Sequence, residues 1–413
     1  MIRSGQADII GSARGSIADP FLPNKINEGH LDDIRECIGC NVCISRWERG
    51  APLICTQNPV ANEEFRRGWH PENFDQAEQP GSVLVAGAGP AGLECARVLG
   101  ARGYDVHLCE AEAEVGGHVR DVMRLPGLAE WGRVVSYRQT QLDKLKNVEI
   151  HTESPMSADN VLTYGADKVV ICTGFTWNGD GMSHVTMAPI PGVDASLAQI
   201  ATPDQVMAGK EIGDRVIVLD GDGYFTGVSL AELLVDQGKQ VSIVTHLPSI
   251  GQMTEYTLEA PNLHRMMHEK GIAQYTSSWF EEVVVDNLVK AKLFNLYRDG
   301  YKRTTEPVAG ELPRKAGTEF EILEADTIVA VTGRSANDGL FRELKQRKTE
   351  WRAEGIEAVY AAGDCYAPRF MADAIFDGHR IAREFETDNP RRALPMLRER
   401  MIWGHDIDPR LDA

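Results

Sequence analysis

The sequence contains few aromatic residues and no long apolar run. Aromatic residues make up 7% of its 413 residues, hydrophobic residues 43% and charged residues 25%. This composition is typical of folded globular proteins and excludes collagen, coiled coils and wholesale disorder. No apolar stretch approaches the about 20 residues that span a bilayer, and the first residues lack the basic and then apolar order of a signal peptide. We therefore expect a cytoplasmic protein of two or three domains.

Basic residues are too few to balance the acidic ones. The 43 lysine and arginine residues against 61 aspartate and glutamate residues give a net charge of −18. A field of this sign repels phosphate backbones and anionic lipid headgroups. Nucleic acid and membranes are therefore excluded as expected partners.

Cysteines are also few, and half of them lie in one short segment. Cys37, Cys40, Cys43 and Cys55 are separated by two, two and eleven residues. Three cysteines at two-residue intervals can wrap a cubane cluster, each thiolate reaching a different iron, and a distant fourth cysteine completes the ligand set. The alternative is structural zinc, which usually takes two separated Cys-x-x-Cys pairs. The spacing favours a 4Fe-4S cluster over zinc.

A glycine loop follows the first strongly apolar run. Residues 83–86 predict a strand, 93–102 a helix and 104–108 a second strand. Glycines in such a loop allow a tight turn and let the backbone approach a pyrophosphate, while an acid at the end of the second strand can bind a ribose. The residues expected to bind an adenine nucleotide are Gly87, Gly89, Pro90, Ala91, Gly92 and Glu110. The alternative is a glycine turn kept only for packing.

The same pattern recurs at residues 215–245, but its glycine loop is altered. Gly227 comes one residue late, Tyr224 and Phe225 replace small residues, and Thr245 stands where a ribose-binding acid is expected. These departures favour a lobe that keeps the fold without binding a nicotinamide nucleotide. We expect apolar strands near residues 168–174, 327–333 and 358–364 to complete the first lobe.

Six segments together match the pattern of one known family. They are residues 8–23, the cysteine run through Trp47, residues 55–59 and 68–71, the first glycine loop, and residues 376–383. These segments resemble the trimethylamine, dimethylamine and histamine dehydrogenases. The resemblance implies an N-terminal (β/α)₈ barrel with FMN and the amine site, then a cluster segment, then a two-lobed domain holding ADP in place of FAD.

The resemblance covers only the last strand and phosphate turn of that barrel, so either the chain is a fragment or another chain supplies the barrel. A short strand is expected at residues 7–13. The resemblance implies that Gly11, Ser12, Ala13 and Arg14 bind the FMN phosphate, and that FMN is retained only with a complete barrel. It also implies that Trp47 belongs to an aromatic box around the substrate cation, with packing beside the cluster as the alternative.

Further motifs resemble those of flavoproteins with two dinucleotide-binding lobes. The residues that carry this resemblance are Gly116, Gly117, Thr173, Gly174, Gly363 and Asp364. The first lobe is therefore expected to hold ADP, with FAD as the alternative.

The expected fold is α/β, with two Rossmann-like lobes, one inserted in the other, after an iron–sulfur segment and a barrel remnant. The expected boundaries are 1–28 for the barrel remnant, 29–80 for the cluster segment, 81–212 and 325–413 for the nucleotide lobe, and 213–324 for the inserted lobe.

The expected function is transfer of electrons from a flavin-oxidised amine through the cluster to an electron-transfer flavoprotein or similar acceptor. One alternative is an NAD(P)H-dependent reductase like the 2,4-dienoyl-CoA reductases, which use another cysteine spacing and a regular second glycine loop. A second is a non-enzymatic cluster subunit with a separate FMN-barrel chain. We also expect a homo-oligomer.

Overall fold

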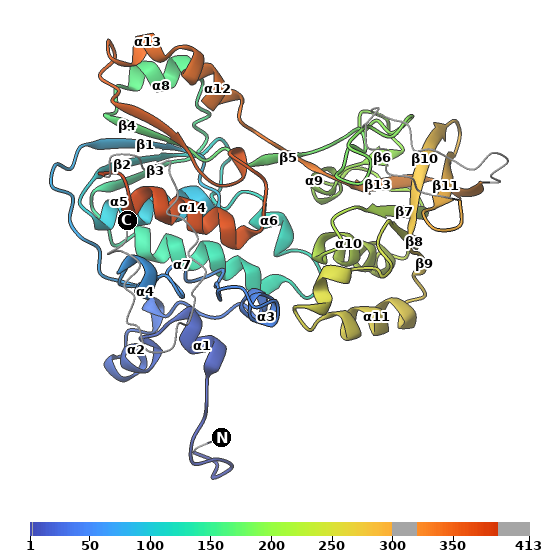
Figure 1. Cartoon of the computed structure of the whole chain (residues 1–413), viewed down its shortest axis with the longest axis horizontal. Helices are drawn as coiled ribbons and strands as arrows, with labels where there is room; N and C mark the ends of the chain where they lie inside the picture. Colours follow the sequence, from blue (N-terminus) through green and yellow to red (C-terminus); the bar gives the residue numbers. More distant parts are fainter. Residues whose placement is uncertain (2, 300–319, 387–413) are drawn as a thin grey trace, which may run out of the picture.

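The computed structural model describes residues 1, 3–299 and 320–386. Figure 1 shows two lobes side by side, with the N-terminal segment beneath the first. Within the described residues no helix is both long and apolar enough to cross a bilayer.

The first lobe is built on a five-stranded parallel sheet of order β15-β4-β1-β2-β3. Its strands are β1 (Ser82–Ala86), β2 (Asp105–Cys109), β3 (Val148–His151), β4 (Lys168–Ile171) and β15 (Ala358–Ala361). The central strands are buried on both sides, as expected of runs rich in valine, isoleucine and leucine in a parallel sheet. Two strands thus follow the predicted βαβ unit, joined by α5 (Pro90–Ala101).

Alternate residues of each strand pack against different helices. Val83 and Val85 face one core and Leu84 and Ala86 the other, because successive strand side chains point to opposite faces. The first face is covered by α5, α7 (Arg133–Leu142) and α14 (Met371–Arg383), and the second by α8 (Ala158–Tyr164), α12 (Gly339–Gln346) and α13 (Lys348–Trp351) (Figure 1). Shorter elements of this lobe are α6 (Val119–Val122), η2 (Ala129–Gly132) and η4 (Gly363–Cys365).

The second lobe has three layers. Its parallel sheet has the order β6-β13-β7-β8-β9, and a three-stranded antiparallel sheet of order β10-β11-β12 covers one face. The parallel strands are β6 (Ile200–Ala201), β7 (Arg215–Asp220), β8 (Gln240–Thr245), β9 (Ala273–Tyr275) and β13 (Thr327–Val331); the antiparallel ones are β10 (Ser278–Val285), β11 (Val289–Asn295) and β12 (Glu321–Ala325). The helical elements are α9 (Pro203–Met207), α10 (Phe225–Asp236), η3 (Gln252–Glu255) and α11 (Ala260–Glu269).

The position of β13 corrects the expected lobe boundary. The expected first lobe is 81–212 and 325–413, but β6 and β13 both lie in the second sheet, where β13 pairs with β7 and β6. The chain crosses between lobes where β5 (Phe175–Trp177) pairs with β14 (Arg334–Ala336) (Figure 1). A continuous apolar strand does not specify which of two parallel sheets it joins. Residues 387–413 of the expected boundary lie outside the described residues.

The prediction of a strand at residues 7–13 is wrong. A helix, α1 (Ala13–Ala18), begins at its end, and Ile9 is 87% exposed. No described strand pairs with this segment, and a strand needs a neighbour to satisfy its backbone hydrogen bonds. Helical turns follow at α2 (Leu22–Glu28), η1 (Leu31–Asp33), α3 (Val42–Glu48) and α4 (Glu64–Arg67).

A buried carboxylate joins the three helices beneath the first sheet. Glu94 of α5 is fully buried, 2.6 Å from Arg97, 2.8 Å from Arg138 on α7 and 2.8 Å from His379 on α14. Burial alone would raise the pKa of Glu94, but Arg97, Arg138 and His379 hold it well below its usual range. Burial lowers the pKa of His379 to about 4. The neutral ring is consistent with its contacts, because Nε2 accepts from Arg383 while Nδ1 donates to Glu94.

Replacing Glu94 with glutamine should lower the free energy of unfolding by about 3–5 kcal/mol, because it leaves buried guanidinium groups without a counter-charge. Urea denaturation at neutral pH measures this loss. Glu269→Gln, an exposed change on α11, is the matched control and should change stability by less than about 0.5 kcal/mol. Equal stability of the two variants would contradict the role assigned to Glu94.

Candidate nucleotide and cluster sites

The four clustered cysteines lie around one end of α3. Cys37 and Cys40 precede the helix, Cys43 lies in its first turn and Cys55 follows it. Between them Asn41 adopts a left-handed conformation, with φ of 53°, which turns the chain into the helix. All four are free thiols. The structure thus places the four cysteines predicted from their spacing around the same helix end.

The environment of three of these thiols favours their protonated form when no metal is bound. Burial raises the pKa of Cys40 and of Cys43, and raises that of Cys55 to about 11. Neighbouring thiols contribute to the shift, because Cys37 acts on Cys43 and Cys40 acts on Cys55. A metal or cluster must therefore displace protons as it binds.

The sulfur positions bear on the choice between zinc and a cluster. In a zinc site with bonds of about 2.3 Å, tetrahedral sulfur atoms lie about 3.8 Å apart. Across the described part of the chain, no three of these sulfur atoms lie mutually within 4.8 Å. The thiols are therefore not arranged as a preformed zinc tetrahedron in the described chain.

Buried polar contacts attach this cysteine segment to the first lobe. Arg138 donates to the side chain and carbonyl of Gln57, at 3.1 and 3.3 Å. Arg35, fully buried, donates to the Tyr137 hydroxyl at 3.2 Å. Arg35 also acts electrostatically on Cys55 and opposes the rise of its pKa, so a buried positive charge lies near the Cys55 thiol.

The first glycine loop has the geometry of a pyrophosphate site. Gly87 has φ of 104°, and a Cβ there would lie 2.4 Å from the Cys172 carbonyl oxygen. A Cβ on Gly92 would lie 1.8 Å from the Gly87 carbonyl oxygen, so close packing of strand and helix requires both glycines. A Cβ on Gly89 would instead meet nothing within 4 Å. The open space beside Gly89 and the N-terminus of α5 can therefore receive an anionic group.

Glu110 lies at the end of β2, beside this loop. Its two carboxylate oxygens accept from the backbone of Ala88 at 2.7 Å and of Glu112 at 3.1 Å. These contacts fix the carboxylate against the glycine loop. Its remaining lone pairs can accept from ribose hydroxyls.

A cavity of about 820 Å³ connects the first glycine loop, the cysteine segment and the second lobe. Predicted residues that line it are Gly87, Gly89, Pro90, Ala91, Glu110, Gly117, Thr173, Gly174, Asp364 and Cys40. Gly92 and Gly116 support the loop, the latter donating to the Ala88 carbonyl at 2.8 Å. A Cβ on Gly363 would lie 2.7 Å from that of Ala91. The cavity can hold a nucleotide that reaches toward the cysteine segment.

The sequence did not reveal two groups in this cavity. His118 stacks on Phe175 with ring centroids 4.1 Å apart, and Arg334 lies over the same ring at 5.2 Å. Both line the cavity. His118 directly follows Gly117 and Arg334 follows Gly333, but only the tertiary structure shows that both contact the same ring.

The second glycine loop is occupied by its own chain. Asp220, at the end of β7, accepts from the backbone of Asp222 at 3.1 Å and of Gly223 at 3.0 Å. A phosphate would need these same amide groups. A Cβ on Gly227 would lie 2.7 Å from the Asp220 carboxyl carbon, so that carboxylate fills the loop. Burial raises the pKa of Asp220 to about 7.

Asp220 was missed by sequence reasoning, although an aspartate directly before the glycine loop is a visible signal. Tyr224 and Phe225 lie as expected at the loop, with ring centroids 4.5 Å apart. Both line the cavity between the lobes. They narrow the space beside the altered loop.

The residues expected to hold a flavin phosphate lie on an exposed N-terminal face. Gly11, Ser12, Ala13 and Arg14 are exposed at the start of α1, and Ser12 makes no side-chain cap there. Arg14 donates to the Asn41 side-chain oxygen, which connects α1 to the cysteine segment. Trp47, on α3, is 71% exposed. In the described chain these residues are exposed and do not enclose a flavin ring.

Comparisons with known proteins identify both lobes. Residues 85–142 match an NAD(P)-binding Rossmann-like domain, and residues 201–332 match the OYE-like second alpha/beta domain. The chain is 50% identical to dimethylamine dehydrogenase of Hyphomicrobium sp. (strain x) over 99% of its own length and 56% of that protein. It is 38% identical, with a TM-score of 0.84, to the solved histamine dehydrogenase from Rhizobium sp. 4-9, covering 97% of this chain and 59% of that one.

A reductase is also among the similar proteins. The chain is 29% identical to a multifunctional alkene reductase/demethylase of Caballeronia cordobensis, over 92% of this chain and 54% of that protein. The chain thus spans about half the length of the curated relatives it matches.

Replacing Cys40 with serine should abolish cluster binding, since one of four thiolate ligands is lost. The wild-type chain should contain about four irons and four acid-labile sulfides after anaerobic purification. Iron, sulfide and zinc analysis with visible absorbance measures both. Cys95→Ala, a buried change on α5 at a cysteine outside the four-cysteine set, is the control and should keep the cluster. Stoichiometric zinc without iron in the wild-type chain would show that the site is structural zinc.

Replacing Gly89 with alanine should preserve the fold and weaken ADP binding at least tenfold. The methyl group meets no protein atom within 4 Å but occupies the space where the pyrophosphate approaches. Titration calorimetry on nucleotide-stripped protein gives the affinity. Gly339→Ala is the matched control, because a Cβ there also meets nothing within 4 Å and the residue does not line the cavity. Unchanged ADP affinity in Gly89→Ala would place the nucleotide elsewhere.

Proposed function

Since the chain belongs to the dimethylamine and histamine dehydrogenase family, we propose that it is the electron-transfer portion of an amine-oxidising enzyme. The observation that carries this proposal is the shared cavity, which Cys40 lines together with the first glycine loop and Glu110. The cysteine segment would hold a 4Fe-4S cluster and the first lobe ADP. When bound with FMN, these groups supply two-electron oxidation of an amine and one-electron transfer onward. An electron-transfer flavoprotein is the proposed acceptor.

Exposed apolar side chains at the N-terminal face favour contact between this face and an FMN barrel. Ile9, Ile10, Ile26, Leu31 and Trp47 are large apolar side chains that are at least 55% exposed there. Apolar residues exposed together mark an interaction surface. Residues 11–14 are exposed at this face and are the proposed contacts of the FMN phosphate. We propose that the barrel covers it, with Trp47 facing the amine site and its ring attracting an alkylammonium group.

Glu110 and Asp364 have distinct proposed roles in the cavity. Glu110 would accept from ribose hydroxyls. Asp364 accepts from the Arg369 backbone at 3.0 Å, and burial raises its pKa. It follows Gly363 and lines the same cavity as the glycine loop, where an extended nucleotide such as FAD would pass. FAD in place of ADP would be recognised by its visible spectrum after extraction.

The second candidate is an NAD(P)H-dependent reductase, favoured by the alkene reductase among the similar proteins. This function needs a nicotinamide site in the second lobe. Asp220 occupies the amide groups of that loop. The Thr245 hydroxyl accepts from the Leu247 amide at 3.3 Å, and threonine offers no carboxylate to a ribose. These contacts favour the amine dehydrogenase proposal.

We predict that NADH and NADPH neither bind below about 1 mM, equivalent to roughly 4 kcal/mol of binding, nor reduce the cluster. The reason is that Asp220 takes the amide donors a pyrophosphate requires. Anaerobic titration followed by visible absorbance and electron paramagnetic resonance measures both, with dithionite as the control that the cluster is reducible. Cluster reduction by stoichiometric NADH or NADPH would overturn the proposed function and establish the reductase.

The same experiment also tests an alkylamine as the reductant of the cluster. Dimethylamine should reduce the cluster only when an FMN barrel is supplied in the same chain or by a second chain. Tight stoichiometric FMN on the 413-residue chain alone would show that no barrel is needed.

A further inference from the structure

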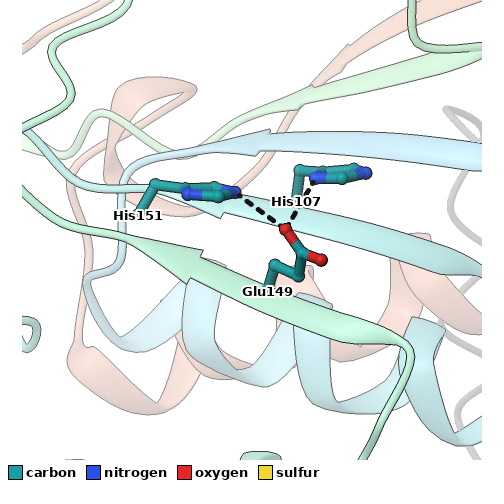
Figure 2. A group of neighbouring side chains, drawn as sticks. All are labelled: His107, Glu149 and His151. Atoms are coloured by element: carbon teal, nitrogen blue, oxygen red, sulfur yellow. Dashed lines mark ion pairs between the residues drawn. The ribbon is translucent and has the colours of Figure 1, made fainter.

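Two histidines and a glutamate gather on the first sheet, away from the cysteine segment. His107 lies on β2, and Glu149 and His151 lie on the neighbouring edge strand β3 (Figure 2). His107 is paired in register with Glu149, and His151 lies two residues further along the same strand. All three side chains therefore point to the same face of the sheet.

The donor atoms of these side chains converge on one point. Glu149 Oε2 lies 3.9 Å from His107 Nδ1 and 3.5 Å from His151 Nε2, and the three atoms lie within 4.8 Å of one another. Bonds of about 2.0–2.2 Å to a tetrahedral ion place its ligands about 3.3–3.6 Å apart. The observed separations are close to those of a metal ligand set.

The same separations are too long for direct hydrogen bonds between the side chains. His107 Nδ1 and His151 Nε2 are both buried and have no hydrogen-bond partner. These are the two nitrogen atoms that face Glu149 in Figure 2. A cation between the three groups would satisfy both nitrogens and the carboxylate at once.

The surroundings also fit a metal site. The other ring nitrogen of His107 lies 3.7 Å from the carboxylate of Asp105, and such a carboxylate commonly orients a metal-bound imidazole. The two imidazole rings are nearly parallel, at 7° with centroids 5.9 Å apart. Glu149 is exposed, so an ion can enter from solvent.

We propose that His107, Glu149 and His151 bind a divalent ion of the Zn²⁺ class, with an open fourth position for water. Two imidazoles and one carboxylate suit Zn²⁺, whereas Mg²⁺ prefers oxygen ligands alone. The ion would join β2 to the edge strand β3. The backbone of His151 also accepts from the amide of Glu110 at 2.8 Å, so this junction lies beside the nucleotide loop. The proposal is independent of the proposed function.

Zinc binding can be tested on the wild-type chain with its cluster in place, so that the four clustered thiols are not available. Zn²⁺ titration by calorimetry should show one site that excess Mg²⁺ does not compete for. His151→Gln and Glu149→Gln should each weaken it at least tenfold. His30→Gln is the matched control. Its Nδ1 also lies 3.7 Å from a glutamate oxygen, that of Glu28, but among the described residues these two do not belong to a group of three converging metal-ligand atoms. This variant should bind Zn²⁺ as the wild type does.

Cobalt substitution reports the ligands directly. Co²⁺ in the proposed site should give weak d–d bands without a thiolate-to-metal charge-transfer band. The bands should disappear in His151→Gln, whose folding is checked by circular dichroism. A thiolate charge-transfer band, or equal Zn²⁺ affinity in the wild type and His151→Gln, would overturn the proposal.

Discussion

The buried charge of Glu94 is the constraint on which the arrangement of the first lobe depends. A lone buried carboxylate is costly, and it is stable here because Arg97, Arg138 and His379 surround it. These partners come from three helices, so the ion pairs fix α5, α7 and α14 relative to one another. Arg138 then continues to Gln57, which transmits the same constraint to the cysteine segment.

This chain of contacts sets the distance between the two candidate cofactor sites. Glu94 lies two residues after Gly92, the last glycine of the first loop. Gln57 lies two residues after Cys55. The nucleotide loop and the cysteine segment are therefore held by one buried network rather than by a flexible linker. The network also carries excess positive charge, because His379 is neutral while Arg35, Arg97 and Arg138 are cationic. That charge would offset the negative charge of four thiolate ligands, a main influence on cluster potential.

The sequence predicted features whose signal is local, and it failed where the answer depends on distant contacts. The βαβ unit with Gly87, Gly92 and Glu110 could be predicted, because steric demands of the loop restrict which residues fit. The sheet chosen by β13 could not, because an apolar strand can join either lobe. The strand at residues 7–13 failed for the related reason that no described strand pairs with it. The convergence of His107 and His151 depends on strand register, which no motif encodes.

The second lobe makes structural contacts that do not depend on a nucleotide. Its glycine loop is closed by Asp220, yet the lobe contacts the cysteine segment through several groups. Asn41, between Cys40 and Val42, donates to the Thr257 carbonyl at 2.7 Å, and Arg49 lies over the Tyr256 ring at 3.7 Å. Asn41 also accepts from Arg14 on the N-terminal face. One asparagine side chain thus connects the second lobe, the cysteine loop and the face proposed to meet the barrel. These contacts require the shape of the lobe and involve no residue of its glycine loop, so the lobe can position the cysteine segment whether or not that loop holds a ligand.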